Sequence, residues 1–165
     1  MKSYQSIQQM CGEAYDIVIA DVIRTNENIF YNGHVNIAPS EVTIRESYLG
    51  RLKKGDTVCI EETGIRQPGG DLAVDGVPLL GENMRVLLFL TEPSGEVQGT
   101  KEGYGILGVY QGKLFIDKSG GIHSGVEYSD QARLSDSLQE QLDLCGTYGD
   151  LATLFPVIVN PYKHL

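Results

Sequence analysis

The sequence predicts a mainly β protein: a small β-barrel of five to seven strands, with a short N-terminal helix and a C-terminal helical segment. Short apolar or alternating runs recur along the chain between glycine turns, and 20 of the 165 residues are glycine, above the average of about 7%. Helical periodicity occurs only near the two ends. No internal repeat divides the chain. We therefore expect one domain over residues 1–165, with the barrel and its leading helix at about 4–118 and an appendage at 119–165.

The N-terminal helix is predicted from three residues that share one face, Tyr4, Ile7 and Cys11. Ser3 is placed to cap this helix and Gly12 to end it. The C-terminal segment carries a second helical face, which ends at Gly146 and is followed by a short strand at 157–159. This face is formed by Leu134, Leu138, Leu142 and Cys145.

The strands between these ends are predicted from β-branched residues and period-two alternation. Val42 and Ile44 mark the buried face of one long strand, and Asn32-Gly33 is a strong signal for a hairpin. The most apolar run, Met84–Leu90, is typical of a strand buried on both faces. The expected strands are 15–23, one near Val35, 41–49, 57–63, 72–74, 84–90, 106–110 and 113–116, with the last two joined as a hairpin at Gln111-Gly112.

A GxGxxG string at Gly103–Gly108 matches the letters of a dinucleotide-binding loop. Such a loop needs a strand before its first glycine and a helix after its last, because the helix amides hold the pyrophosphate. Here β-forming residues follow the string, so we interpret Gly103 and Gly105 as sites of a bulge or of tight curvature. No cofactor is expected.

The formal net charge of −9 argues against nucleic acid as a partner, because phosphate recognition needs clustered Lys and Arg. Three cysteines, Cys11, Cys59 and Cys145, lie too far apart for a metal pattern. One disulfide or three reduced thiols are both compatible with this spacing. No metal site and no transmembrane segment are expected.

The sequence contains no spacing of residues that is typical of a catalytic site. The three histidines, His34, His123 and His164, are far apart, and Ser124 beside His123 does not supply triad geometry. The pair Glu61-Glu62 would point to opposite faces of a strand, and we interpret it as part of a solvated face. No catalytic residue is predicted. The alternative, a hydrolase, requires His34 or His123 within hydrogen-bond reach of a carboxylate in a cleft.

Tyrosines are concentrated in the second half of the chain, and Tyr104, Tyr110 and Gln111 are the candidate ligand-binding residues. If two or three of these tyrosines line one barrel surface, they form a platform for stacking or for a sugar. The alternative is that they pack half-buried at the barrel rim, as amphipathic tyrosines commonly do.

Six segments follow one another in a characteristic order: the helix leading into 15–22, and then 52–58, 67–70, 81–82, 87–90 and 108–115. This order of motifs resembles a group of uncharacterised β-barrel proteins of Gram-positive bacteria, many of them secreted or lipid-anchored. The resemblance covers about residues 4–118 and implies a barrel like the oligonucleotide/oligosaccharide-binding (OB) fold, with no known catalytic residues.

The resemblance and the missing catalytic pattern together predict a non-catalytic binding module of the cell envelope. Its partner would be a protein, a peptide or a glycan. We expect an extracytoplasmic location if a leader peptide has been removed, and a cytoplasmic one otherwise. Besides the hydrolase, a second alternative is an assembly protein that acts through an exposed sheet edge.

Overall fold

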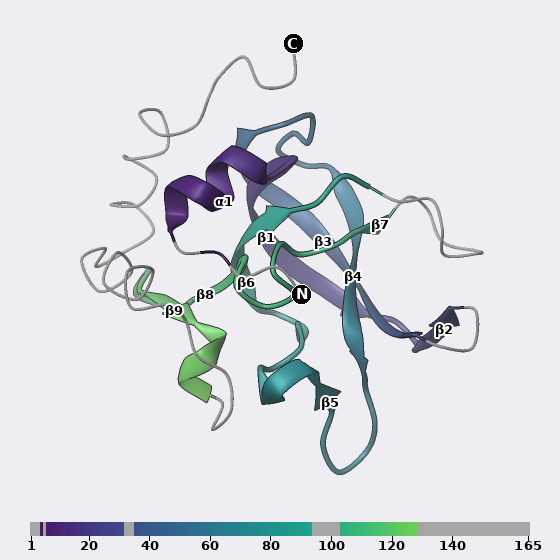
Figure 1. Cartoon of the computed structure of the whole chain (residues 1–165). Helices are drawn as coiled ribbons and strands as arrows, with labels where there is room; N and C mark the ends of the chain where they lie inside the picture. The colour runs from purple at the N-terminus through teal and green to yellow at the C-terminus, as the bar shows by residue number, and fades with distance from the viewer. Residues whose placement is uncertain (1–3, 5, 32–34, 94–102, 129–165) are drawn as a thin grey trace.

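The computed structural model is mainly β, and it describes residues 4, 6–31, 35–93 and 103–128 (Figure 1). One α-helix and nine strands lie in this part of the chain. The elements are α1 (Ile7–Glu13), β1 (Asp16–Thr25), β2 (Ile29–Tyr31), β3 (Val35–Leu49), β4 (Thr57–Ile65), β5 (Leu72–Ala73), the 3-10 turn η1 (Val74–Gly76), β6 (Arg85–Leu90), β7 (Gly103–Tyr104), β8 (Lys113–Ile116), β9 (Ile122–Ser124) and the 3-10 turn η2 (Gly125–Tyr128).

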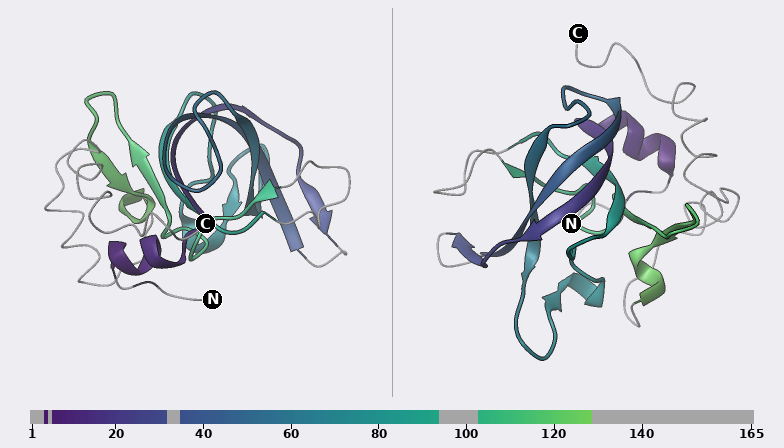
Figure 2. Two further views of the ribbon diagram at one scale, coloured as in Figure 1. Left: turned by 90° about the horizontal axis from the view of Figure 1, so that it is seen from above. Right: turned by 180° about the vertical axis from the view of Figure 1, so that it is seen from behind.

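The strands form one curled sheet in the order β5-β4-β3-β1-β6-β8-β9, with β2 beside β3 and β7 parallel to β4. After β7 the chain crosses to the end of β6, where the amide of Thr91 donates to Gly105 O (2.9 Å) and that of Leu107 to Phe89 O (3.0 Å). These bonds close the open side of a half-barrel through β1, β3, β4, β7 and β6, which appears as a ring of strands in Figure 2. The predicted small β-barrel is confirmed.

Two apolar cores explain why β6 is so hydrophobic. Val86, Leu88 and Leu90 point into the barrel. The alternate residues Leu87 and Phe89 pack on the outer face of the sheet, in the cluster that includes α1. Each of these five side chains is fully buried. A strand buried on both faces has no solvated side to alternate toward, so the prediction from its sequence is confirmed.

The predicted N-terminal helix is confirmed, but its ends differ from the prediction. Ser6 is the cap, and its Oγ accepts from the Gln9 amide (3.0 Å). The helix passes through Gly12 and ends at Glu13, where Ala14 turns to extended backbone. Ser3 lies outside the described residues. The buried face of the helix, Ile7 with Met10 and Cys11, packs in one cluster with Ile17 and Ile19 of β1.

The predicted strand at 106–110 and its hairpin with 113–116 are wrong. Turns occupy 107–112, and β8 pairs with β6 and β9 instead. Gln111 holds this turn region, because its Oε1 accepts from the Tyr4 amide (2.9 Å) and its Nε2 donates to Tyr4 O (3.2 Å). This long-range contact, together with the positive φ of Val109, overrides the local preference of these residues for a strand.

The first described elements of the predicted appendage are β9, which extends the sheet beyond β8, and η2, which follows it. The C-terminal helical face, the strand at 157–159 and the Asn32-Gly33 turn lie outside the described residues. The strands that flank this turn pair as a hairpin, with Tyr31 opposite Val35. None of the described helices has the length and hydropathy needed to cross a membrane.

Candidate functional site

The candidate site is a groove of about 690 Å³, within the range of about 300–1,000 Å³ that is typical of small-molecule sites. The strap 77–84 forms one wall and the β8–β9 hairpin another. The β8–β9 hairpin lies outside the closed circuit of strands (Figure 1). The groove is lined by Asp21, Pro78, Asn83, Met84, Arg85, Phe115, Ile116, Asp117, Lys118 and His123.

The body of the groove is apolar. Pro78 and Met84 come from the strap, and Phe115 and Ile116 come from β8. Apolar walls with a few charged groups at the rim are the usual composition of a ligand site. We name this surface, with the ten lining residues given above, the strap groove.

Asp21 lies at one rim of the strap groove between two arginines. Arg85 donates from Nε to Asp21 Oδ1 and Arg45 from Nη1 to Oδ2, each at 2.9 Å. Partial burial alone raises the pKa of Asp21, but the hydrogen bonds from Arg85 and Arg45 outweigh burial and lower the pKa below its usual value. Asp21 is therefore an ionised group whose charge is already neutralised.

Asp117 lines the groove from the turn between β8 and β9. Its Oδ2 is 2.6 Å from His123 Nε2, and its Oδ1 accepts from the amides of Ser119 (2.9 Å) and Gly121 (2.8 Å). The contact with His123 and then the amide of Gly121 lower the pKa of Asp117 to about 2. This carboxylate thus organises its own turn.

We expect Asp117 to titrate with a midpoint of about 2, against 3.8 for a free aspartate. Because its pKa is lower in the folded chain, the contact stabilises the turn above the unfolded value and is lost as the pH falls from 3.8 to about 2. NMR shifts of the Ser119 and Gly121 amides would follow this titration. The variant His123→Gln should move the midpoint upward, whereas an unchanged midpoint would contradict the assigned contact.

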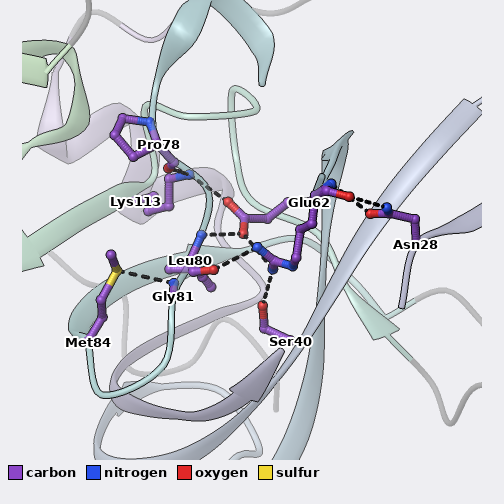
Figure 3. Close-up of polar contacts among 9 residues, drawn as sticks. Asn28, Ser40, Glu62, Pro78, Leu80, Gly81, Met84 and Lys113 are labelled. Atoms are coloured by element: carbon purple, nitrogen blue, oxygen red, sulfur yellow. Dashed lines mark hydrogen bonds and ion pairs between the residues drawn. The ribbon is translucent and has the colours of Figure 1, made fainter. Parts of the chain in front are cut away.

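A buried ion pair supports the strap from inside the barrel (Figure 3). Lys113 Nζ lies 2.5 Å from Glu62 Oε2 and donates to Pro78 O (2.7 Å), while the amide of Leu80 donates to Glu62 Oε1 (2.8 Å). Glu62 is 4% exposed and Lys113 is 2% exposed. The prediction that Glu62 belongs to a solvated face is therefore wrong. It follows Ile60 by two positions in β4, so both point into the barrel.

Arg66 extends this network to the next strand. It donates from Nη1 to Leu80 O (2.8 Å) and from Nη2 to Ser40 Oγ (2.7 Å). Its own backbone is paired with the side-chain amide of Asn28, at 2.7 and 2.9 Å. The strap is thus fastened at Pro78 and Leu80 by charged side chains of β4, β8 and the turn after β4 (Figure 3).

The other end of the strap is fastened to β1. Val22 donates from its amide to Met84 O (2.9 Å) and accepts at its own carbonyl from the Asn83 amide (3.0 Å). The Gly81 amide contacts Met84 Sδ (3.2 Å). The strap residues of the groove wall are Pro78, Asn83 and Met84, and the barrel therefore holds the strap at both ends.

The three candidate ligand residues from the sequence lie elsewhere. Tyr104 belongs to the barrel core, Tyr110 packs with Val77, and Gln111 holds Tyr4. They are 9%, 8% and 4% exposed, and they do not line the strap groove. Their role in binding stays a prediction. Sequence patterns do not identify the other groove residues, because a strap and a turn leave no periodic signal; His123 alone is a candidate from the sequence.

The remaining candidate groups give a mixed picture. His34 and His164 lie outside the described residues. Cys11 of α1 is buried in the core, and Cys59 is a free thiol. Burial, with the nearby Glu61, raises the pKa of Cys59 to about 11. Such a thiol is a poor nucleophile at neutral pH. Within the described part of the chain, no three His, Cys, Asp or Glu side chains gather closely enough to hold a metal ion.

The GxGxxG string is not followed by a helix, because turns follow β7 from residue 107. Gly103 instead permits the close approach of the Glu61 side chain, since a Cβ at this position would lie 2.2 Å from Glu61 Oε1.

A comparison of the chain with family models, with curated proteins and with solved structures finds no match.

Proposed function

We propose that this chain is a non-catalytic binding module and that the strap groove is its ligand site. The observation that carries this proposal is the groove itself: about 690 Å³, apolar in its body and charged at its rim. Its two walls are held by a buried ion pair and by backbone hydrogen bonds. Such fixed walls lower the entropy cost of binding.

The partner class is a protein, a peptide or a glycan of the bacterial cell envelope. Support for the envelope comes from the resemblance of 4–118 to secreted and lipid-anchored barrel proteins. Support for a partner of this size comes from the groove, which accommodates a few side chains or sugar rings. Fractionation of the native cells, followed by detection of the chain in the wall, membrane and cytoplasmic fractions, tests the location.

A fluorescent reporter tests the binding site. The chain has no tryptophan, so Phe115→Trp places a single one in the groove wall. The matched control is Phe30→Trp on β2, where Phe30 is 67% exposed and outside the groove. We expect ligand binding to shift the emission of the first variant and to leave that of the second unchanged. Equal shifts in both variants, or a shift in the control alone, would contradict the proposed site.

A hydrolase is the second candidate, and one observation favours it. His123 lies 2.6 Å from Asp117 at the groove rim, as this alternative requires. However, both Asp117 oxygens are occupied, one by His123 and the other by the turn amides, which accounts for the pair without catalysis. Turnover of a bound ester, amide or glycoside that is lost in His123→Gln would select the hydrolase.

A further inference from the structure

The charged groups that line the strap groove differ in how far the protein already pairs them. Its carboxylates are paired, whereas its cations keep unused hydrogen-bond donors. We infer that it selects a ligand with a carboxylate attached to an apolar body, and that Arg85 and Lys118 contact the carboxylate. This inference rests on the proposal that the strap groove is a ligand site, and it extends the possible ligands from peptides to small apolar acids.

The two carboxylates of the groove are already satisfied by the protein. Asp21 is held between Arg45 and Arg85. Asp117 accepts from two backbone amides and contacts His123. Neither therefore needs a cation from the ligand, and a cationic ligand would have to displace these contacts.

The cations of the groove keep unused donors. Arg85 contacts Asp21 through Nε only, and its two Nη groups, with four further N–H donors, make no hydrogen bond to any residue that the structure describes. Lys118 is exposed and forms no ion pair within the described residues. The planar guanidinium suits a carboxylate, and an ammonium adds a second attractive charge.

The neighbouring cavity supplies an internal contrast. It holds about 500 Å³ and shares Pro78 and Met84 with the strap groove, so the strap separates the two. Its exposed charged residues are the acidic Asp71 and Glu82, and its cation, Arg66, is committed to Ser40 and Leu80. An anionic ligand is repelled there and attracted to the strap groove, whose apolar body receives the rest of the molecule.

Two sources supply this chemistry, a fatty acid and the C-terminus of a peptide that ends in an apolar residue. Isothermal titration of the full chain at low ionic strength separates them. The probes are octanoate against octanamide, and N-acetyl-Phe-Leu against its C-terminal amide. We expect each acid to bind about tenfold more tightly than its amide. The pair that binds more tightly identifies the source.

Substitutions of Lys118 and Arg85 test whether these two side chains contact the carboxylate of the ligand. Lys118→Gln should weaken binding of the acid about threefold, as for an exposed ion pair, and Arg85→Gln should weaken it about tenfold. Lys53→Gln changes the net charge equally at an exposed lysine outside the groove, and it should change the affinity less than twofold. Lys118→Gln alters an exposed side chain and so keeps the test valid if Arg85→Gln is unstable.

Three results would overturn the inference. Acids and amides that bind equally well would show that the groove binds without selecting a carboxylate, which leaves the proposed function intact. Equal weakening by Lys53→Gln and Lys118→Gln would show an effect of net charge alone. Absence of binding by both probe pairs would overturn it as well, and the tryptophan reporter at position 115 then decides separately whether the groove is a site for anything else.

Discussion

Replacing Lys113 with methionine is expected to lower the free energy of unfolding by about 3–5 kcal/mol, because it removes the cation that contacts the buried Glu62 carboxylate directly. Among the described residues only Arg66 then remains, with its Nη2 4.0 Å from Glu62 Oε1. The ammonium also donates to Pro78 O, so the strap loses one of its fastenings. Chemical denaturation in urea measures the loss. The same variant should weaken ligand binding in the strap groove, since Pro78 is part of its wall.

Two controls separate this cause from simple loss of a side chain. The double variant Glu62→Gln with Lys113→Met removes both charges and should recover much of the lost stability. Lys118→Met removes an exposed lysine nearby and should change stability by less than about 0.5 kcal/mol. A loss below about 1 kcal/mol in Lys113→Met would contradict a buried ion pair that supports the strap.

Gly50→Ala is expected to cost about 3 kcal/mol or more. Gly50 has a φ of +102°, and a Cβ there would lie 1.8 Å from Asp16 Oδ1 and 2.8 Å from Tyr15 O. Asp16 is fully buried and accepts from the Leu52 amide (3.2 Å), so its side chain cannot move aside without losing that bond. Thermal and urea unfolding both report the change.

Gly55→Ala is the matched control. Gly55 has a nearly equal φ of +95°, but a Cβ at this position meets nothing within 4 Å. Its cost should be that of the backbone conformation alone, about 1–2 kcal/mol. The difference between the two variants isolates the collision with Asp16. Equal costs would show that Asp16 and Leu52 do not clamp the turn after β3.

The scaffold of this protein is readable from local sequence patterns. A strand that is buried on both faces has a continuous run of apolar residues. The runs that form β1 and β6 can therefore be recognised without knowledge of their partners. The N-terminal helix is also local, although its cap is Ser6. Alternation in β3 correctly places Val42 and Ile44 in the interior.

Long-range contacts explain why the predictions for 106–110 and for Glu62 were wrong. The strand preference of 106–110 yields to the bonds between Gln111 and Tyr4, which are 107 positions apart. Glu62 resembles a surface residue until Lys113, 51 positions later, is placed opposite it. A single sequence contains both residues but not their proximity. The one available sign was that Glu62 shares the face of Ile60.

The strap groove is the least predictable part of the molecule. Its residues come from β1, the strap, β6, β8, β9 and the turn between β8 and β9, and none of these segments carries a motif. Only folding brings Met84 and Phe115 to one surface. By contrast, Tyr104 and Tyr110 are predicted as ligand residues because tyrosines are concentrated in the second half of the chain. In the structure both pack in apolar clusters.

The proposal that the strap groove is the ligand site has one direct measurement. The emission of Phe115→Trp and of Phe30→Trp is recorded while an extract of bacterial cell envelope, and then N-acetyl-Phe-Leu, is titrated into each variant. The account predicts a saturable shift in Phe115→Trp and a constant spectrum in Phe30→Trp. A saturable shift confined to Phe30→Trp, or binding by calorimetry that leaves the Phe115→Trp spectrum unchanged, would place the ligand elsewhere and contradict it.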